Sequence, residues 1–257
     1  MKNFKVLLLT VVAALSLSSC FGEGDPNVTN QEFVKVENFY GNISFKSAGG
    51  YTIKPINQLD PMITAISSRF AQLVYQYNRN EVVYPVKEVN AKVLYADNIL
   101  DMYYHPSQTV NENAPMASIM DGAATQVKFY DKDNIFLPVS FYYKASSDSN
   151  EQQKEVKSHH FELVPMENDN DASDIVTLRL VHNVDDVALD KDRKTVGSMF
   201  THIDLSHVLG GKIPEKLVIK YKKAANNASF EEAYKDLGNI TIYYRDIYER
   251  YFKPKNK

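Results

Sequence analysis

The 257 residues are enough for one large or two ordinary domains. Lys and Arg number 29 against 32 Asp and Glu, a formal net charge of -3, and no basic run forms a patch, which disfavours nucleic-acid binding. Cys20 is the only cysteine, and without a second one the sequence excludes an intrachain disulfide, a thiolate metal cluster and any cysteine nucleophile other than Cys20.

The N-terminus has the layout of an export signal. Lys2 and Lys5 precede the uncharged stretch VLLLTVVAALSL at 6–17. As a helix this stretch would span roughly 18 Å, short of the ~30 Å hydrocarbon core, so a permanent transmembrane helix is not expected. The letters LSSC, ending at Cys20, resemble a bacterial lipobox, in which the cysteine thiol accepts diacylglycerol. We therefore predict a cleaved signal peptide at 1–19 and lipidation of Cys20.

Residues 20–30 are predicted to form a lipidated tether. The letters FGEGDPN after Cys20 are polar and rich in Gly and Pro, as in linkers. Several acyl chains on Cys20 would anchor the protein stably, since one chain binds a membrane only marginally. The expected location is the outer membrane, on its periplasmic or its cell-surface face.

Period-two alternation predicts an all-β fold. Five short strands in about 65 residues suit a small closed, OB-like barrel at 31–101. Ser47 to Gly50 is predicted to be a hairpin turn, and Asp60 to cap a helical turn. The apolar positions expected on one face of each strand are Val34 and Val36; Ile43 and Phe45; Tyr51 and Ile53; Ala71, Leu73, Tyr75 and Tyr77; and Val89, Ala91, Val93 and Tyr95.

From 102 to 122 the alternation lapses, which predicts a linker. It resumes in 123–257, where the strand spacing predicts an antiparallel β-sandwich. The polar stretches 145–157 and 167–174 are expected to be loops, where binding residues would lie. Gly238 is expected to end a short helix. The alternating positions are Leu137, Val139, Phe141 and Tyr143; Phe161 and Leu163; Val176, Leu178 and Leu180; Leu217, Ile219 and Tyr221; and Ile240, Ile242 and Tyr244.

The histidine and acidic clusters do not predict a metal site. His159 and His160 are adjacent in a strand, so they point to opposite faces, and His160 with Glu162 gives only two ligands. Two acidic segments lack the spacing of a calcium loop and are expected to be solvated turns. Their residues are Asp185, Asp186, Asp190 and Asp192 after His182, and Glu167, Asp169, Asp171 and Asp174.

A serine–histidine cluster does not predict catalysis. Ser198, His202, Asp204, Ser206 and His207 lie close in sequence, but no Gly-x-Ser-x-Gly elbow accompanies them. Strand alternation places Ser198, His202 and Asp204 on a solvent face. No phosphate loop, dinucleotide fingerprint or His-Glu-x-x-His motif occurs. We expect no catalytic residues, no metal and no cofactor.

Six segments with strand patterns, together with the lipobox, carry a family resemblance over nearly the whole mature chain. They are GNISFKSAGGYTIKPIN at 41–57, RFAQLVYQYNR at 69–79, EVNAKVLYADNIL at 88–100, IVTLRLVHNVDD at 175–186, THIDLSHVLGG at 201–211 and KLVIKYKKA at 216–224. In these motifs the chain resembles the NigD-like lipoproteins of Bacteroidetes. The resemblance implies an N-terminal OB-like barrel and a C-terminal β-sandwich. The family takes its name from a bacteriocin-associated operon.

These observations favour a non-enzymatic, envelope-anchored module that binds a protein or a glycan, or protects its own cell. A structural subunit of a fimbria or surface assembly and a glycan-binding surface lipoprotein are the alternatives. A hydrolase with an unrecognised site is a third class. The expected partners are the membrane, through Cys20, and a protein or glycan, but no nucleic acid.

Overall fold

A computed structural model of the protein describes residues 25–106, 112–114, 116–118, 127–166, 174–185, 193–223 and 237–254. The predicted signal peptide and Cys20 lie outside these ranges. The chain forms two compact units that divide between Asn98 and Ile99. None of the helices in the described ranges has both the length and the apolar character needed to cross a membrane.

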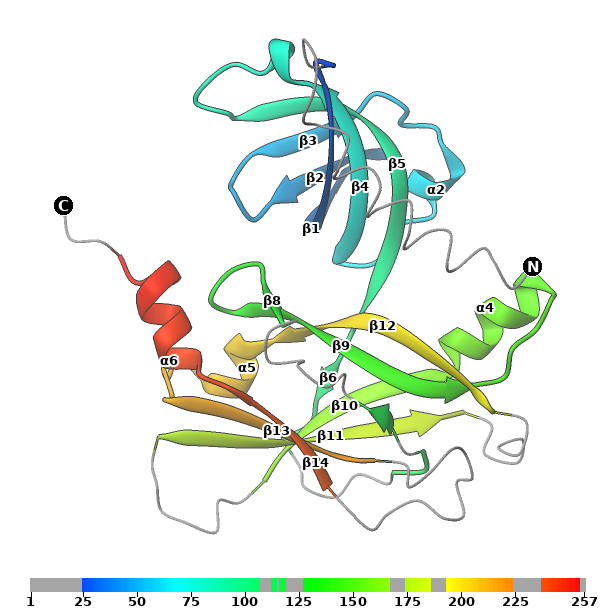
Figure 1. The fold of residues 1–257 in the computed structure, drawn as a ribbon, viewed down its shortest axis with the longest axis vertical. Coiled ribbons are helices and arrows are strands. Elements are labelled where there is room, and N and C mark those ends of the chain that lie inside the picture. Colours follow the sequence, from blue (N-terminus) through cyan, green and yellow to red (C-terminus); the bar gives the residue numbers. More distant parts are fainter. Residues whose placement is uncertain are drawn as a thin grey trace. The chain divides into compact units, whose positions relative to one another are not determined.

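The first unit is the predicted barrel, a closed sheet of five strands (Figure 1). The strands follow one another in the order β3-β2-β1-β4-β5, and a parallel pairing of β3 with β5 closes the ring. This pairing order is the one expected of an OB-like barrel. The strands are β1 (Asn27–Phe39), β2 (Asn42–Ser47), β3 (Thr52–Pro55), β4 (Phe70–Asn78) and β5 (Glu88–Asp101).

The turns of the barrel form as their residues predict. Gly50 has a φ of 86°, which favours glycine, and its N–H donates to the Ser47 carbonyl at 3.0 Å. The Asp60 side chain accepts from the Met62 N–H at 3.1 Å and caps α2 (Pro61–Thr64). A short 3-10 helix, η1 (Arg79–Glu81), follows β4.

A half-buried carboxylate organises polar groups of the barrel. Glu32 Oε1 accepts from the hydroxyls of Tyr75 at 2.5 Å and Tyr51 at 2.7 Å, and Oε2 accepts from Ser47 Oγ at 2.6 Å. Burial, together with Glu32, raises the pKa of Tyr75. These bonds satisfy polar groups that would be costly to leave unpaired next to the apolar core. That core is formed by Val34, Ile43, Phe45, Ile53, Ile63, Ile66, Ala71, Leu73, Tyr75, Val89, Ala91 and Val93.

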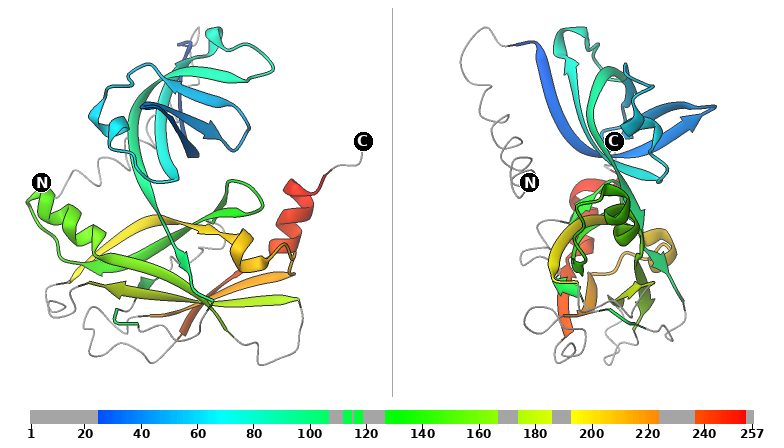
Figure 2. Two further views of the ribbon diagram at one scale, coloured as in Figure 1. Left: turned by 180° about the vertical axis from the view of Figure 1, so that it is seen from behind. Right: turned by 90° about the vertical axis from the view of Figure 1, so that its right-hand side faces the viewer.

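The second unit is a sandwich of two sheets over one core. Figures 1 and 2 show β9 and β12 in one layer and β10, β11, β13 and β14 in the other. The first sheet contains β7 (Met116–Ser118), β8 (Lys128–Phe129), β9 (Asn134–Tyr143), β12 (Thr195–Asp204) and the end of β5. The second contains β6 (Tyr103–Tyr104), β10 (His159–Pro165), β11 (Ile175–Val184), β13 (Lys216–Lys222) and β14 (Leu237–Ile242).

Helices flank the sandwich strands. They are α4 (Ser149–Lys157), α5 (Leu205–Leu209), α6 (Tyr244–Ile247) and η3 (Tyr248–Phe252), a π-helical segment that continues α6. The apolar positions expected from alternation pack into the shared core, including Leu137, Val139, Phe141, Leu163, Leu178, Leu180, Leu217, Ile219 and Ile242.

The sandwich differs from the predicted antiparallel arrangement at three parallel pairings, which join β11 to β13, β10 to β6, and β12 to the end of β5. β11 and β13 run parallel, from Ile175 opposite Lys216 to Leu180 opposite Tyr221, so this sheet is mixed. Alternation reports which face of a strand is buried, but it carries no information on strand direction. The two-sheet architecture is unaffected, because the apolar side chains of both sheets face the shared core as predicted.

Three segments have structure that differs from their predicted description. In the expected linker at 102–122, Tyr103 and Tyr104 pair with β10, and the Glu112 carboxylate is buried against Arg179 and Lys222. In the expected tether at 20–30, Asn27 already begins β1 and pairs with Asn78. The expected loop at 145–157 contains α4, capped by Asp148.

Gly238 lies in β14, opposite Tyr221 of β13, and does not end a helix there. A Cβ on Gly238 would lie 2.4 Å from Tyr221 Cζ, well inside contact distance. The missing side chain therefore makes room for the tyrosine ring, as glycines beside cross-strand aromatics do.

Gly238→Ala should lower the free energy of unfolding by about 1–3 kcal/mol, because the new methyl group displaces the Tyr221 ring. In an unobstructed strand the same change would stabilise, since alanine loses less backbone entropy than glycine. Urea unfolding of the intact protein measures the difference. Asn239→Ala, at an exposed neighbouring position, serves as the control, and equal stability of the two variants would contradict the packing argument.

Candidate functional site

The first candidate site is a buried histidine pair in the sandwich. His159 Nδ1 of β10 and His182 Nε2 of β11 lie 2.9 Å apart, and the two rings are stacked with centroids 5.2 Å apart. Phe161 stacks on His182 with a centroid distance of 4.7 Å. Both histidines are buried. The pair is thus packed as part of the core, and aromatic contacts hold its orientation.

Helix α4 supplies the carboxylate of this cluster. Glu155 Oε1 lies 3.3 Å from His159 Nε2 and accepts from Arg193 Nε at 2.7 Å. Burial acts to raise the pKa of Glu155, but the hydrogen bonds from Arg193 and from the Lys144 backbone outweigh it and lower that pKa. Burial lowers the pKa of His159 to about 4, against the opposing effect of Glu155. His159 is therefore neutral near pH 7.

The residues weighed for metal binding do not converge. His160 lies on the other side of the strand from His159, as predicted, and its Nε2 is 2.8 Å from Asp185 Oδ1. Glu162 instead lies 3.4 Å from His105 Nε2. In the ranges that the structure describes, no group of three or more His, Cys, Asp or Glu side chains could hold a metal ion. Asp186, Asp190, Asp192, Glu167, Asp169 and Asp171 lie outside those ranges.

The serine–histidine cluster separates into unrelated contacts. His202 is buried, which corrects the predicted solvent face, with Nδ1 2.6 Å from Asp101 and Nε2 2.9 Å from Asn134. Ser198 Oγ instead pairs with Ser140 Oγ at 2.7 Å. Asp204 caps α5 by accepting from the Ser206 N–H at 3.1 Å. With both ring nitrogens of His202 engaged elsewhere, these groups do not form a serine–histidine pair.

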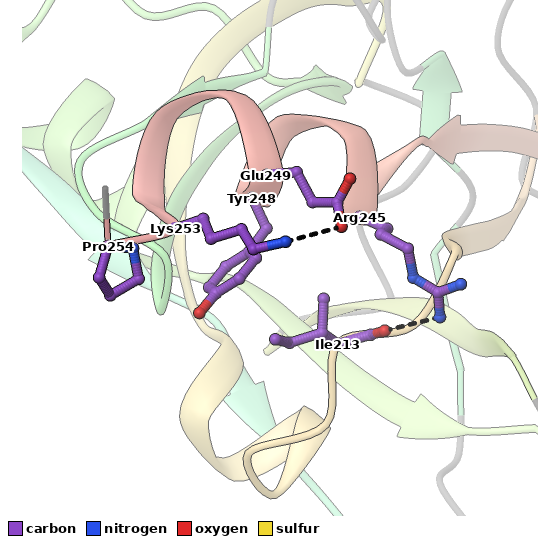
Figure 3. A pocket seen from close by; sticks show the side chains of 6 residues that line it. All are labelled: Ile213, Arg245, Tyr248, Glu249, Lys253 and Pro254. Carbon is purple, nitrogen blue, oxygen red and sulfur yellow. Dashed lines mark hydrogen bonds and ion pairs between the residues drawn. The ribbon is translucent and has the colours of Figure 1, made fainter. Parts of the chain in front are cut away.

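The second candidate site is the surface around the C-terminal helix. On one side is a hollow of about 460 Å³, which we call the C-terminal hollow (Figure 3). Its charged groups are paired. Arg245 donates to Asp174 at 2.6 Å and to the Ile213 carbonyl at 3.0 Å, while Lys253 Nζ lies 3.5 Å from Glu249. The lining residues are Ile213, Arg245, Tyr248, Glu249, Lys253 and Pro254.

A second hollow of about 290 Å³, which we call the tyrosine hollow, lies between β14 and the same helix. Tyr243 and Tyr251, which line it, are 55% and 68% exposed. Asp246 and Arg250 add one charge of each sign. The lining residues are Thr241, Ile242, Tyr243, Asp246, Ile247, Arg250 and Tyr251.

The sequence did not point to this surface. The expected binding loops were 145–157 and 167–174, yet both hollows use residues from 241–254. One signal was available: the letters YYRDIYERYF at 243–252 place tyrosines and charges at helical spacing. The same pattern is typical of an ordinary amphipathic helix. Only the exposure of its tyrosine side chains in the structure distinguishes this segment as a candidate binding surface.

Comparisons with known proteins support the fold. No protein-family model and no curated protein matches this sequence. Among solved structures, a presumed lipoprotein from Bacteroides fragilis is 24% identical with a TM-score of 0.67, covering 84% of this chain and 98% of that one. A presumed toxin-related protein from Parabacteroides distasonis is 13% identical with a TM-score of 0.54, covering 89% of this chain and 100% of that one.

A NigD-like immunity protein from Bacteroides caccae is 13% identical, with a TM-score of 0.49 over 83% of this chain and 92% of that one. The first two structures show that a barrel followed by a sandwich is a shared fold, and they do not establish a shared activity.

The buried histidine pair predicts acid sensitivity. Because the pKa of His159 is about 4 in the folded protein and about 6.5 when unfolded, only the unfolded chain takes up this proton between those values. The free energy of unfolding should therefore fall with pH below about 6.5, by about 2 kcal/mol from this residue at pH 4.5.

Denaturant unfolding of His159→Gln at pH 7.0 and 4.5 tests this prediction. The variant should be less stable at pH 7 but should lose less stability on acidification than the wild type. His207→Gln, at an exposed position in α5, is the control and should lose as much stability as the wild type between pH 7.0 and 4.5. If His159→Gln lost as much free energy of unfolding on acidification as the wild type, other groups would be responsible for the acid sensitivity.

Proposed function

We propose that this protein is an envelope lipoprotein of the NigD-like kind, held at the outer membrane by acyl chains on Cys20, whose two β units form a non-enzymatic binding or protective module. The lipobox ending at Cys20 supports the anchor. The fold shared with a presumed lipoprotein from Bacteroides fragilis is consistent with it. The expected processing removes residues 1–19.

The observation that carries the binding role is the surface around α6 and η3. Two hollows flank this short helical segment, and its exposed tyrosines leave aromatic rings in water. Exposed aromatic side chains offer a large contact area with little loss of rotamer entropy, which is why tyrosine is enriched at binding surfaces. Concave sites with aromatic walls and a few polar groups are typical of ligand binding.

A fimbrial or surface-assembly subunit is the second candidate. β14 has β13 as its neighbour at one end of the five-strand order in the described sheet. A free strand edge can accept a strand from another subunit. This role requires self-association, so a strictly monomeric mature protein, also after trimming at the N-terminus, would favour the binding role. A protective role linked to a bacteriocin would fit the name of the resembling family.

Cys20→Ser should move the protein from the membrane fraction to the soluble periplasmic fraction or leave it unprocessed, because serine offers no thiol to the lipid transfer reaction. Fractionation with immunoblotting measures the shift. Phe21→Ser, which alters the same junction and keeps the thiol, should stay on the membrane. Membrane retention of Cys20→Ser equal to the wild type would remove the proposed anchor.

Mature protein immobilised through its N-terminus should retain a component of envelope extracts that a lipid-tether control does not retain. Intact-protein mass spectrometry and glycan analysis of the eluate identify whether that component is protein or glycan. Retention that does not exceed the tether control would count against the binding role. Protease shaving of intact cells, in parallel, assigns the face of the membrane.

A further inference from the structure

We propose, building on the binding role above, that the tyrosine hollow is a binding site for a neutral glycan. The site is formed by Tyr243 and Tyr251 as stacking platforms and by Asp246 and Arg250 as the polar groups that engage sugar hydroxyls.

The stacking platforms are two exposed rings at one hollow. Each has a cation near its ring: Lys216 Nζ lies 5.6 Å from the Tyr243 centroid, and Arg250 Cζ lies 6.0 Å from the Tyr251 centroid. These contacts favour one ring orientation over others. Lys216 is not among the residues that line the hollow, whereas Tyr243 is. The apolar C–H face of a pyranose ring fits such an aromatic face.

The polar groups match the needs of hydroxyls. Asp246 only accepts and Arg250 only donates, whereas each sugar hydroxyl does both. Residues four apart on a helix share a face. Asp246 and Arg250 nevertheless form no ion pair with each other or with other described residues, and the Arg250 guanidinium lies over the Tyr251 ring. Both groups can therefore form hydrogen bonds with a ligand. Hydrogen bonds to charged groups are stronger than those between neutral groups.

The charges favour a neutral ligand. The hollow contains one carboxylate and one guanidinium, so neither sign dominates. A polyanion would approach Arg250 but would meet Asp246 beside it, and like charges at close range are unfavourable. A neutral polyol gains bonds to both groups without this penalty.

The size favours one or two sugar residues over an extended peptide. The volume of about 290 Å³ is close to the lower end of the about 300–1,000 Å³ range of small-molecule sites. A glycan chain can place one ring in the hollow and continue into solvent.

The helix that carries these residues is fixed to the sandwich. Tyr244 is buried, and its hydroxyl donates to the Lys132 carbonyl at 2.7 Å. Arg245 binds Asp174 at 2.6 Å. Because both contacts anchor the first turn of the helix, the backbone that carries the site does not have to be ordered by the ligand, which lowers the entropic cost of binding.

The test is binding of the mature chain without its lipidated cysteine, residues 21–257, to a glycan array of neutral and anionic structures, followed by titration with the best neutral oligosaccharide. Wild-type protein should bind neutral glycans, and Tyr243→Ala and Tyr251→Ala should each weaken binding at least 10-fold. Asp246→Asn and Arg250→Gln should weaken it about 5- to 10-fold. Tyr243→Phe should stay within about threefold, since the ring remains.

Tyr103→Ala is the matched control, because Tyr103 is an exposed tyrosine of the same unit outside the hollow. Thermal unfolding of each variant checks the fold. Absence of binding to every neutral glycan, binding to anionic glycans alone, or equal binding by the tyrosine variants would overturn the proposal. Loss of binding after protease treatment of a glycoprotein ligand would assign the hollow to a peptide instead.

The outcomes separate this site from the broader role. If the hollow variants bind like wild type while the mature protein still retains an envelope component, the glycan site is wrong and the binding role stands. If no envelope component is retained but purified neutral glycans bind through the tyrosines, the site stands and its ligand comes from outside the cell.

Discussion

Strand β5 provides pairings that both units need. Its first part pairs with β3 in parallel, from Thr52 opposite Glu88 to Pro55 opposite Ala91, and this pairing closes the barrel. Its last residues pair with β12 in the second unit, where Asp101 also binds His202. Closure removes the sheet edges that would otherwise be open to other chains. A protein without disulfides depends on such pairings and on its two apolar cores.

Local patterning accounts for the parts of the fold that the sequence predicts. Alternation at Val89, Ala91 and Val93 identifies a half-buried strand because side chains repeat every two residues. The Asp60 cap and the Gly50 turn are likewise properties of a few neighbouring residues. These signals are short-range, so one sequence is sufficient to read them.

The missed features depend on partners far away in the chain. The parallel direction of β11 and β13 depends on how the chain crosses between them. Alternation assigned His202 to solvent, yet Asn134 and Asp101 satisfy its ring in the core. Helix α4 was expected to be loop because its residues are polar, although Asp148 and Glu151 have the spacing of a helix start. The exposure of Tyr243 and Tyr251 also depends on distant packing.

The early start of β1 limits how far the protein can stand from a membrane. With Asn27 already paired to Asn78, six residues separate Cys20 from the barrel. At about 3.3–3.6 Å per residue, this length reaches roughly 20–25 Å at full extension. If Cys20 carries the proposed lipid, the N-terminal end of β1 stays within that distance of the headgroups. A binding partner of the barrel's N-terminal edge would then have to reach it within about 25 Å of the lipid headgroups.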